Sequence, residues 1–200
     1  MIRFFVGEGG VGLREKRQVR AWLQEVLSHS GVHKADLNYI FCGDEYLYQL
    51  NLEYLGHDTY TDIITFPGSS GDIAKEKTIS GECYISTDRI ADNASQLGVS
   101  YVEELHRVMA HGILHLLGFG DKSEEEASKM REEENAALLM RKFHVEQSAF
   151  MPVKGTASSK KGGVSKVESG GGAKERASEL FHVEQIMFIE DVVNVSADGG

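Results

Sequence analysis

The chain has 200 residues, 41% of them hydrophobic, which suits one globular domain with a tail and excludes a wholly disordered protein. Its formal net charge is −10, and the first 150 residues carry 15 basic against 24 acidic side chains. This balance argues against a broad non-specific nucleic-acid surface without excluding a local basic groove. The two cysteines lack CxxC spacing, and the N-terminal apolar run is short. We therefore expect a cytoplasmic protein with no signal peptide and no membrane span.

The apolar pattern predicts both strands and helices along the first 142 residues. Strands are expected at Ile2–Val6, Leu37–Cys42, Asp62–Phe66 (ended by Pro67) and 80–86. Residues 15–29 place five apolar side chains on one helical face, namely Val19, Trp22, Leu23, Val26 and Leu27. Further helices are expected at about Glu45–Leu55, from Ser86 or Thr87 to Leu97, from Ser100 to Leu117, and from Ser123 to about Lys142. The last two begin with the S-x-x-E spacing of a capping box.

The composition changes near residue 150. Residues 154–178 are rich in Gly, Ser and Lys and nearly lack large apolar side chains, which is typical of a flexible linker. The apolar segment that follows is too short to form a core alone. We therefore predict one domain at 1–148, followed by a low-complexity linker and short tail at 149–200.

The segment HGILHLLGFGD at 111–121 predicts a metal site. His111 and His115 are four residues apart, so both imidazoles lie on one helical face, and Gly118 lets the chain turn so that Asp121 can supply a third donor. Such His and carboxylate sets are typical of catalytic zinc sites. Zinc proteases with this spacing have a catalytic Glu after the first His, but here that residue is Gly112, which argues against peptide hydrolysis. The alternative is an amphipathic helix that carries two unrelated histidines.

Three segments together resemble one known family. The first is HGILHLLGFGD, similar to H-G-x-L-H-L-x-G-[YF]-D-H; the others are NLEYLGHDTYTDIITFP at 51–67 and ISGECYIS at 79–86. All three resemble motifs of the YbeY family of bacterial rRNA maturation endoribonucleases. The resemblance implies an α+β fold, in which a small mixed β-sheet packs with helices and a zincin-like helix binds the metal.

The same resemblance implies a function. It implies a zinc-dependent endoribonuclease, with one Zn²⁺ per chain, that cuts single-stranded RNA in 16S rRNA 3′-end maturation and ribosome quality control. Its partners would be pre-16S rRNA, the small ribosomal subunit and assembly proteins in the cytoplasm. His111 and His115 match the first two family ligands. A coordinated water, activated by the metal, would then act on the phosphodiester.

The chain departs from the family pattern at the third ligand and at one arginine. The third family histidine is Asp121 here, and the Asp before it is Gly120. A carboxylate can still bind zinc, but it makes a bound water less acidic and favours harder ions. The family arginine is Leu55 here, which removes a cation that could stabilise the transition state. Two alternatives therefore stay open: an assembly or protein-binding factor with a structural metal, and a metallohydrolase with another substrate.

Other residues are expected to support the site. Thr61 and Asp62 match a family pair, and Asp62 would brace its loop or orient a metal-bound histidine. Arg107 is a second candidate for support or for substrate binding. The missing arginine could be replaced by any of four cations, namely Lys75, Lys77, Arg89 and Arg107, among which the sequence does not choose. Aromatic side chains are available to stack on bases, namely Tyr54, Tyr60 and Phe66. The acidic clusters at 124–126 and 131–134 are interpreted as a solvated helix face.

Overall fold

The computed structural model describes residues 1–68 and 73–150. Its four strands are β1 (Ile2–Val6), β2 (Lys34–Cys42), β3 (Ile63–Pro67) and β4 (Thr78–Ser86). Its helices are α1 (Lys16–His29), α2 (Asp44–Leu50), the π-helical turn η1 (Asn51–Leu55), α3 (Ile73–Glu76), α4 (Thr87–Leu97), α5 (Tyr101–Leu116) and α6 (Glu124–Phe150). The expected linker and tail lie outside the described residues, except for 149 and 150. Among the described helices none is long and apolar enough to cross a bilayer.

The strands form one mixed sheet in the order β1-β2-β4-β3. β1 and β4 both pair in parallel with β2, and β3 pairs antiparallel with β4. β3 is therefore an edge strand. This position explains why Pro67 can belong to the strand, whereas the sequence suggested that it would end it, because an edge strand can lack one amide donor. The α+β class with a small mixed sheet is confirmed.

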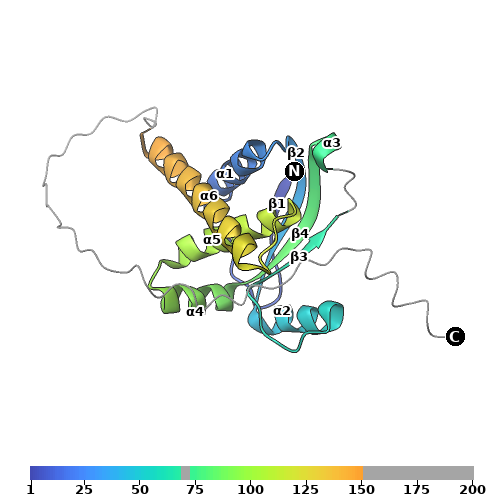
Figure 1. Ribbon diagram of the computed structural model, residues 1–200. Helices are drawn as coiled ribbons and strands as arrows, with labels where there is room; N and C mark the ends of the chain where they lie inside the picture. Colours follow the sequence, from blue (N-terminus) through green and yellow to red (C-terminus); the bar gives the residue numbers. More distant parts are fainter. Residues whose placement is uncertain (69–72, 151–200) are drawn as a thin grey trace, which may run out of the picture.

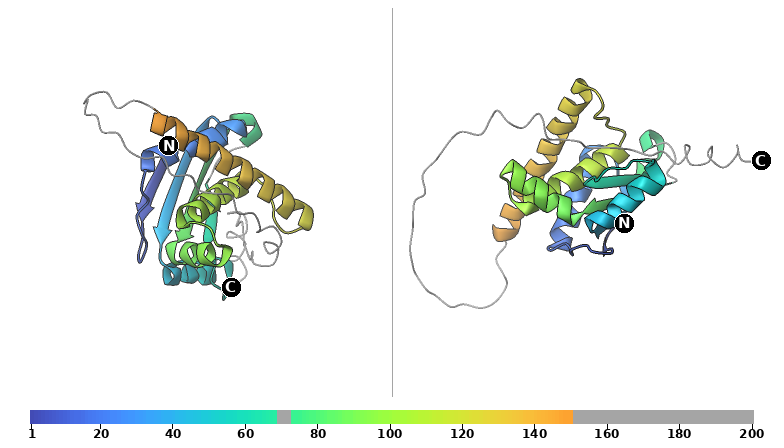
Figure 2. Two further views of the ribbon diagram at one scale, coloured as in Figure 1. Left: turned by 90° about the vertical axis from the view of Figure 1, so that its left-hand side faces the viewer. Right: turned by 90° about the horizontal axis from the view of Figure 1, so that it is seen from below.

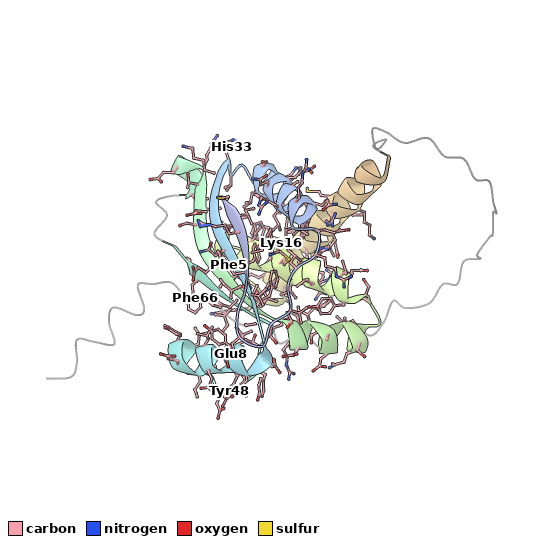
Figure 3. All side chains as sticks on the ribbon, turned by 180° about the vertical axis from the view of Figure 1, so that it is seen from behind. Phe5, Glu8, Lys16, His33, Tyr48 and Phe66 are labelled. Atoms are coloured by element: carbon pink, nitrogen blue, oxygen red, sulfur yellow. The ribbon has the colours of Figure 1, made fainter. Side chains whose placement is uncertain are left out.

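Helices α1, α5 and α6 cover one face of the sheet, as Figures 1 and 2 show. The main core lies between these layers and includes Trp22, Leu37, Ile85 and Met109, all fully buried. Because alternate strand residues point to opposite faces, a second, smaller cluster forms on the other face around Cys42, Leu47 and Ile64. Figure 3 shows this face from behind, where α2 covers only one end and Phe5 and Phe66 lie along the sheet.

The structure confirms most of the expected elements. The five apolar residues expected on one face of α1 are its buried residues, and Ser86 caps α4 by accepting a hydrogen bond from the amide of Arg89 at 3.1 Å. Three boundaries differ from the expected ones. β2 begins at Lys34 rather than Leu37, because it pairs along its whole length with β4, which begins at Thr78 rather than at residue 80. Helix α6 runs to Phe150 rather than to about Lys142.

Candidate metal centre

Helix α5 brings the two histidines together in the interior. The Ser100 hydroxyl accepts a hydrogen bond from the amide of Glu103 at 3.1 Å and so starts the helix. His111 and His115 are one turn apart and each is only 4% exposed. Their rings have centroids 4.2 Å apart and planes at 88°. The helical spacing therefore yields two imidazoles that meet at one buried point.

The turn after α5 brings Asp121 to the same point. The amide of Gly118 donates to the carbonyl of His115 and the amide of Phe119 donates to Leu114, at 2.8 and 3.0 Å. This is the hydrogen-bond pattern of a Schellman motif, and Gly118 takes the required positive φ of 93°. One Asp121 oxygen, Oδ2, then lies 3.5 Å from Nε2 of His115 and 4.0 Å from Nε2 of His111. The three donors lie within 4.8 Å of one another and could hold a metal ion.

Each ring uses Nδ1 in a hydrogen bond, which leaves Nε2 available to bind a metal. Nδ1 of His115 lies 3.0 Å from the carbonyl oxygen of Phe119, which can only accept, so that nitrogen carries the proton. Nε2 of both rings is buried without a hydrogen-bond partner among the described residues. Burial and the neighbouring His111 lower the pKa of His115 to about 4, so the ring is neutral near pH 7. Two unpartnered imidazole nitrogens beside a carboxylate are a donor set that fits a divalent ion.

Glu134 on α6 is the partner of His111, and the sequence interpretation missed it. Its Oε1 lies 2.8 Å from Nδ1 of His111, and the residue is 6% exposed. The interpretation of 131–134 as a solvated face was therefore wrong at this residue. A signal was present, because Glu134 shares the helical stripe of the buried residues Met130 and Ala137, and an acid in such a stripe needs a partner.

The residues expected to support the site are distributed differently. Arg107 donates to Oε2 of Glu134 at 3.0 Å and to Oδ1 of Asn135 at 3.0 Å, so it lies behind the site. Asp62 is buried and accepts from Nδ2 of Asn93 at 3.2 Å, while its backbone carbonyl accepts from Ser86. It thus ties its loop to α4, and it is not the hydrogen-bond partner of either histidine Nδ1. Thr61 is buried beside it, with its hydroxyl 3.5 Å from the carbonyl of Ile63.

A second buried acid, Glu104, lies on α5 two turns before His111. It is 1% exposed, and neither carboxylate oxygen has a hydrogen-bond partner among the described residues. Burial, reinforced by the charge of Asp62, raises the pKa of Glu104 to about 7. Burial also raises the pKa of Asp62, although His111 opposes this. Burial therefore favours the protonated form of both Glu104 and Asp62.

Local packing explains two departures from the family pattern. A Cβ on Gly120 would lie 2.8 Å from the carboxylate of Glu126, so an aspartate there would meet a like charge. Leu55 packs on the small cluster of Cys42, Leu47 and Ile64, on the sheet face opposite the main core. The chain thus uses position 55 for apolar contact.

The sequence matches one family of known proteins over most of its length. The family model described as Endoribonuclease YbeY matches residues 12–142. The chain belongs to the YbeY family. Relatives named Endoribonuclease YbeY include that of Christiangramia forsetii, 43% identical over 73% of this chain and 96% of the relative. The relative from Cytophaga hutchinsonii is 46% identical over 71% of this chain and 96% of the relative. The relative from Flavobacterium johnsoniae is 48% identical over 63% of this chain and 86% of the relative.

A solved structure supports the fold. The solution structure of TM1509 from Thermotoga maritima matches with a TM-score of 0.53 at 23% identity, covering 79% of this chain and all of that one. At this identity the likeness concerns the fold alone. Together with the family match, it places the α5 histidines in a YbeY-family domain.

Proposed function

We propose that this YbeY-family protein is a zinc-dependent endoribonuclease that cuts single-stranded RNA, with precursor 16S rRNA as its substrate and ribosome assembly as its setting. The observation that carries the proposal is the convergence of His111, His115 and Asp121, with two unpartnered Nε2 atoms, in a chain of this family. The names of the relatives supply the reaction class.

His111, His115 and Asp121 would hold the ion, with Zn²⁺ favoured by two imidazoles and a small donor set. A bound zinc ion supplies Lewis acidity, which lowers the pKa of a coordinated water and polarises a phosphate oxygen. Burial lowers the pKa of His115 and so keeps that ring neutral near pH 7 and able to bind. Asp121 contributes a negative charge that moderates the Lewis acidity compared with three imidazoles.

The surroundings support RNA as the substrate. Lys122 and Lys129 are exposed beside the Asp121 loop, and Lys129 also covers the ring of Phe119 with its ammonium 5.3 Å from the centroid. These cations can attract phosphates. Tyr54 and Tyr60 are 46% and 50% exposed, so their rings are accessible for stacking on unpaired bases.

The test is cleavage of a single-stranded RNA that spans the 3′ end of precursor 16S rRNA, by the full chain loaded with zinc. We expect cleavage by the parent and a loss of at least about 100-fold in Asp121→Ala, because removal of a ligand exceeds the usual cost of removing a supporting residue. The matched control is Asp92→Ala, which removes an exposed aspartate from α4. A folded, zinc-loaded parent that leaves the RNA intact would refute the nuclease function.

A further inference from the structure

The two histidines are held from behind by different chemical groups. His115 faces a neutral backbone carbonyl from the turn that follows its own helix. His111 faces a carboxylate from another helix, with Nδ1 2.8 Å from Oε1 of Glu134. A carboxylate accepts a stronger hydrogen bond than a carbonyl and makes the imidazole a better donor to a metal. The two donors are therefore not equivalent.

Glu134 is itself held in place by charged neighbours on both helices. Arg107 Nη1 lies 3.0 Å from Oε2, and Arg131 Nε lies 3.8 Å from the same oxygen. The two carboxylate oxygens thus have different partners: Oε1 contacts His111, and Oε2 contacts the two arginines.

The Glu134 carboxylate bridges two residues of the neighbouring helix. Arg107 and His111 are one turn apart on α5, and the Glu134 carboxylate from α6 lies between them. With one oxygen on each neighbour, Glu134 cannot rotate without losing a charged hydrogen bond. Its contact requires the proton of His111 on Nδ1, which leaves the lone pair of Nε2 facing Asp121.

We propose that Glu134 is a positioning residue of the metal centre, which fixes the tautomer and orientation of His111, and that Arg107 acts on the metal only by holding Glu134. The proposal rests on the metal site proposed above. It gives Arg107 a structural anchor role in place of substrate binding. It also excludes Glu134 as the general base, because both of its oxygens are engaged.

The test measures the affinity of the full chain for Zn²⁺ and Co²⁺ by competition with a chromophoric chelator. We expect Glu134→Ala to weaken both about 10- to 100-fold, the usual effect of removing a group behind a metal-bound histidine. Glu134→Gln keeps an acceptor oxygen and should retain most of the affinity lost in Glu134→Ala. Glu132→Gln, an exposed acid on the same helix, should bind like the parent.

Three further measurements separate positioning from other roles. The Co²⁺ absorption bands of Glu134→Gln should match the parent, since Glu134 is not a ligand; changed bands would overturn the proposal. Arg107→Gln should weaken binding in the parent but have no further effect in Glu134→Ala, where nothing remains for Arg107 to hold. An additive loss would overturn the role given to Arg107. The melting temperature of each metal-free variant should not follow its affinity for Zn²⁺. If the variants with the weakest binding were also the least stable, in the same order, Glu134 would have only a structural role.

The failure of this proposal differs from failure of the proposed function. A parent protein that binds neither ion would refute the metal site, and with it the role of Glu134. A parent that binds zinc, and a Glu134→Ala variant that binds it equally well, would refute the positioning role alone.

Discussion

Gly112 of α5 lies directly against Ile63 of β3: a Cβ on the glycine would be 2.7 Å from Cδ1 of Ile63 and 3.2 Å from Sγ of Cys83. Helix α5 is therefore packed closely against the antiparallel edge strand. Zinc proteases with the same ligand spacing place their catalytic glutamate at this position. Here any side chain at position 112 would require the buried end of the Ile63 side chain to move, so the close packing favours glycine where those proteases have glutamate.

Gly112→Ala should destabilise the protein. In an open helix this change would stabilise by about 1 kcal/mol, because alanine has the higher helix propensity. The clash with Ile63 should reverse the sign and cost about 1–3 kcal/mol, which is typical of overpacking. Urea unfolding of the parent, Gly112→Ala and the exposed control Val102→Ala measures the free energy of unfolding. A gain in stability for Gly112→Ala would show that the two elements can separate freely.

Glu126→Ala should loosen the loop that carries Asp121. The Glu126 carboxylate accepts from the amides of Lys122 and Ser123 at 3.1 Å, and its own amide donates to the Ser123 hydroxyl at 3.2 Å. Loss of this reciprocal cap should cost about 1 kcal/mol of stability. It should also weaken zinc binding, because Asp121 directly precedes Lys122, whose amide Glu126 holds. Chelator competition on this variant and on Glu125→Ala, an exposed neighbour, provides the measurement; equal affinities would separate the loop from the metal.

Glu104 should make the protein less stable as the pH rises. Its pKa is about 7 in the folded chain against 4.5 unfolded, so between these values the native state binds the extra proton. The stabilisation is complete below pH 4.5 and is lost as the pH rises through 7. The loss is worth about 3 kcal/mol at most.

Glu104→Gln should remove that slope. Chemical unfolding at pH 5 and pH 8 tests this, with Glu132→Gln as an exposed control. The parent should lose stability relative to Glu104→Gln between the two pH values, while Glu132→Gln follows the parent. Parallel curves for the parent and Glu104→Gln would mean that a neighbouring donor satisfies the carboxylate.

Asp121→His should change the preference between metals. The substitution replaces a hard carboxylate by an imidazole and completes the three-histidine pattern of the family. Zn²⁺ should then be favoured over Mn²⁺ by about tenfold more than in the parent, since carboxylates suit Mn²⁺ better than imidazoles do. Competition titrations at fixed pH give the ratio, with Asp92→His as control. An unchanged ratio would mean that residue 121 does not contact the ion.

The sequence predicted those features that depend on local pattern. Helical spacing placed His111 with His115, and the glycine turn placed Asp121 beside them. The roles of Glu134 and Arg107 depend on how α5 packs against α6. The sequence placed Glu134 on a helical stripe with Met130 and Ala137, but it did not indicate that His111 and Arg107 are its partners. His106 is likewise fixed by packing between helices: it is 6% exposed, with its ring centroid 5.2 Å from that of Trp22.

Trp22 is the only tryptophan in the chain, and its indole nitrogen donates to the carbonyl of Ala137 at 2.7 Å. That acceptor lies on α6, three residues after Glu134. The tryptophan fluorescence of the protein therefore comes from a single indole, which contacts the helix that carries Glu134. If α6 moved away from α1, the indole would be exposed to water and its emission would shift to longer wavelength. The emission wavelength of Trp22 therefore reports whether α6, which carries Glu134, is packed in place behind His111.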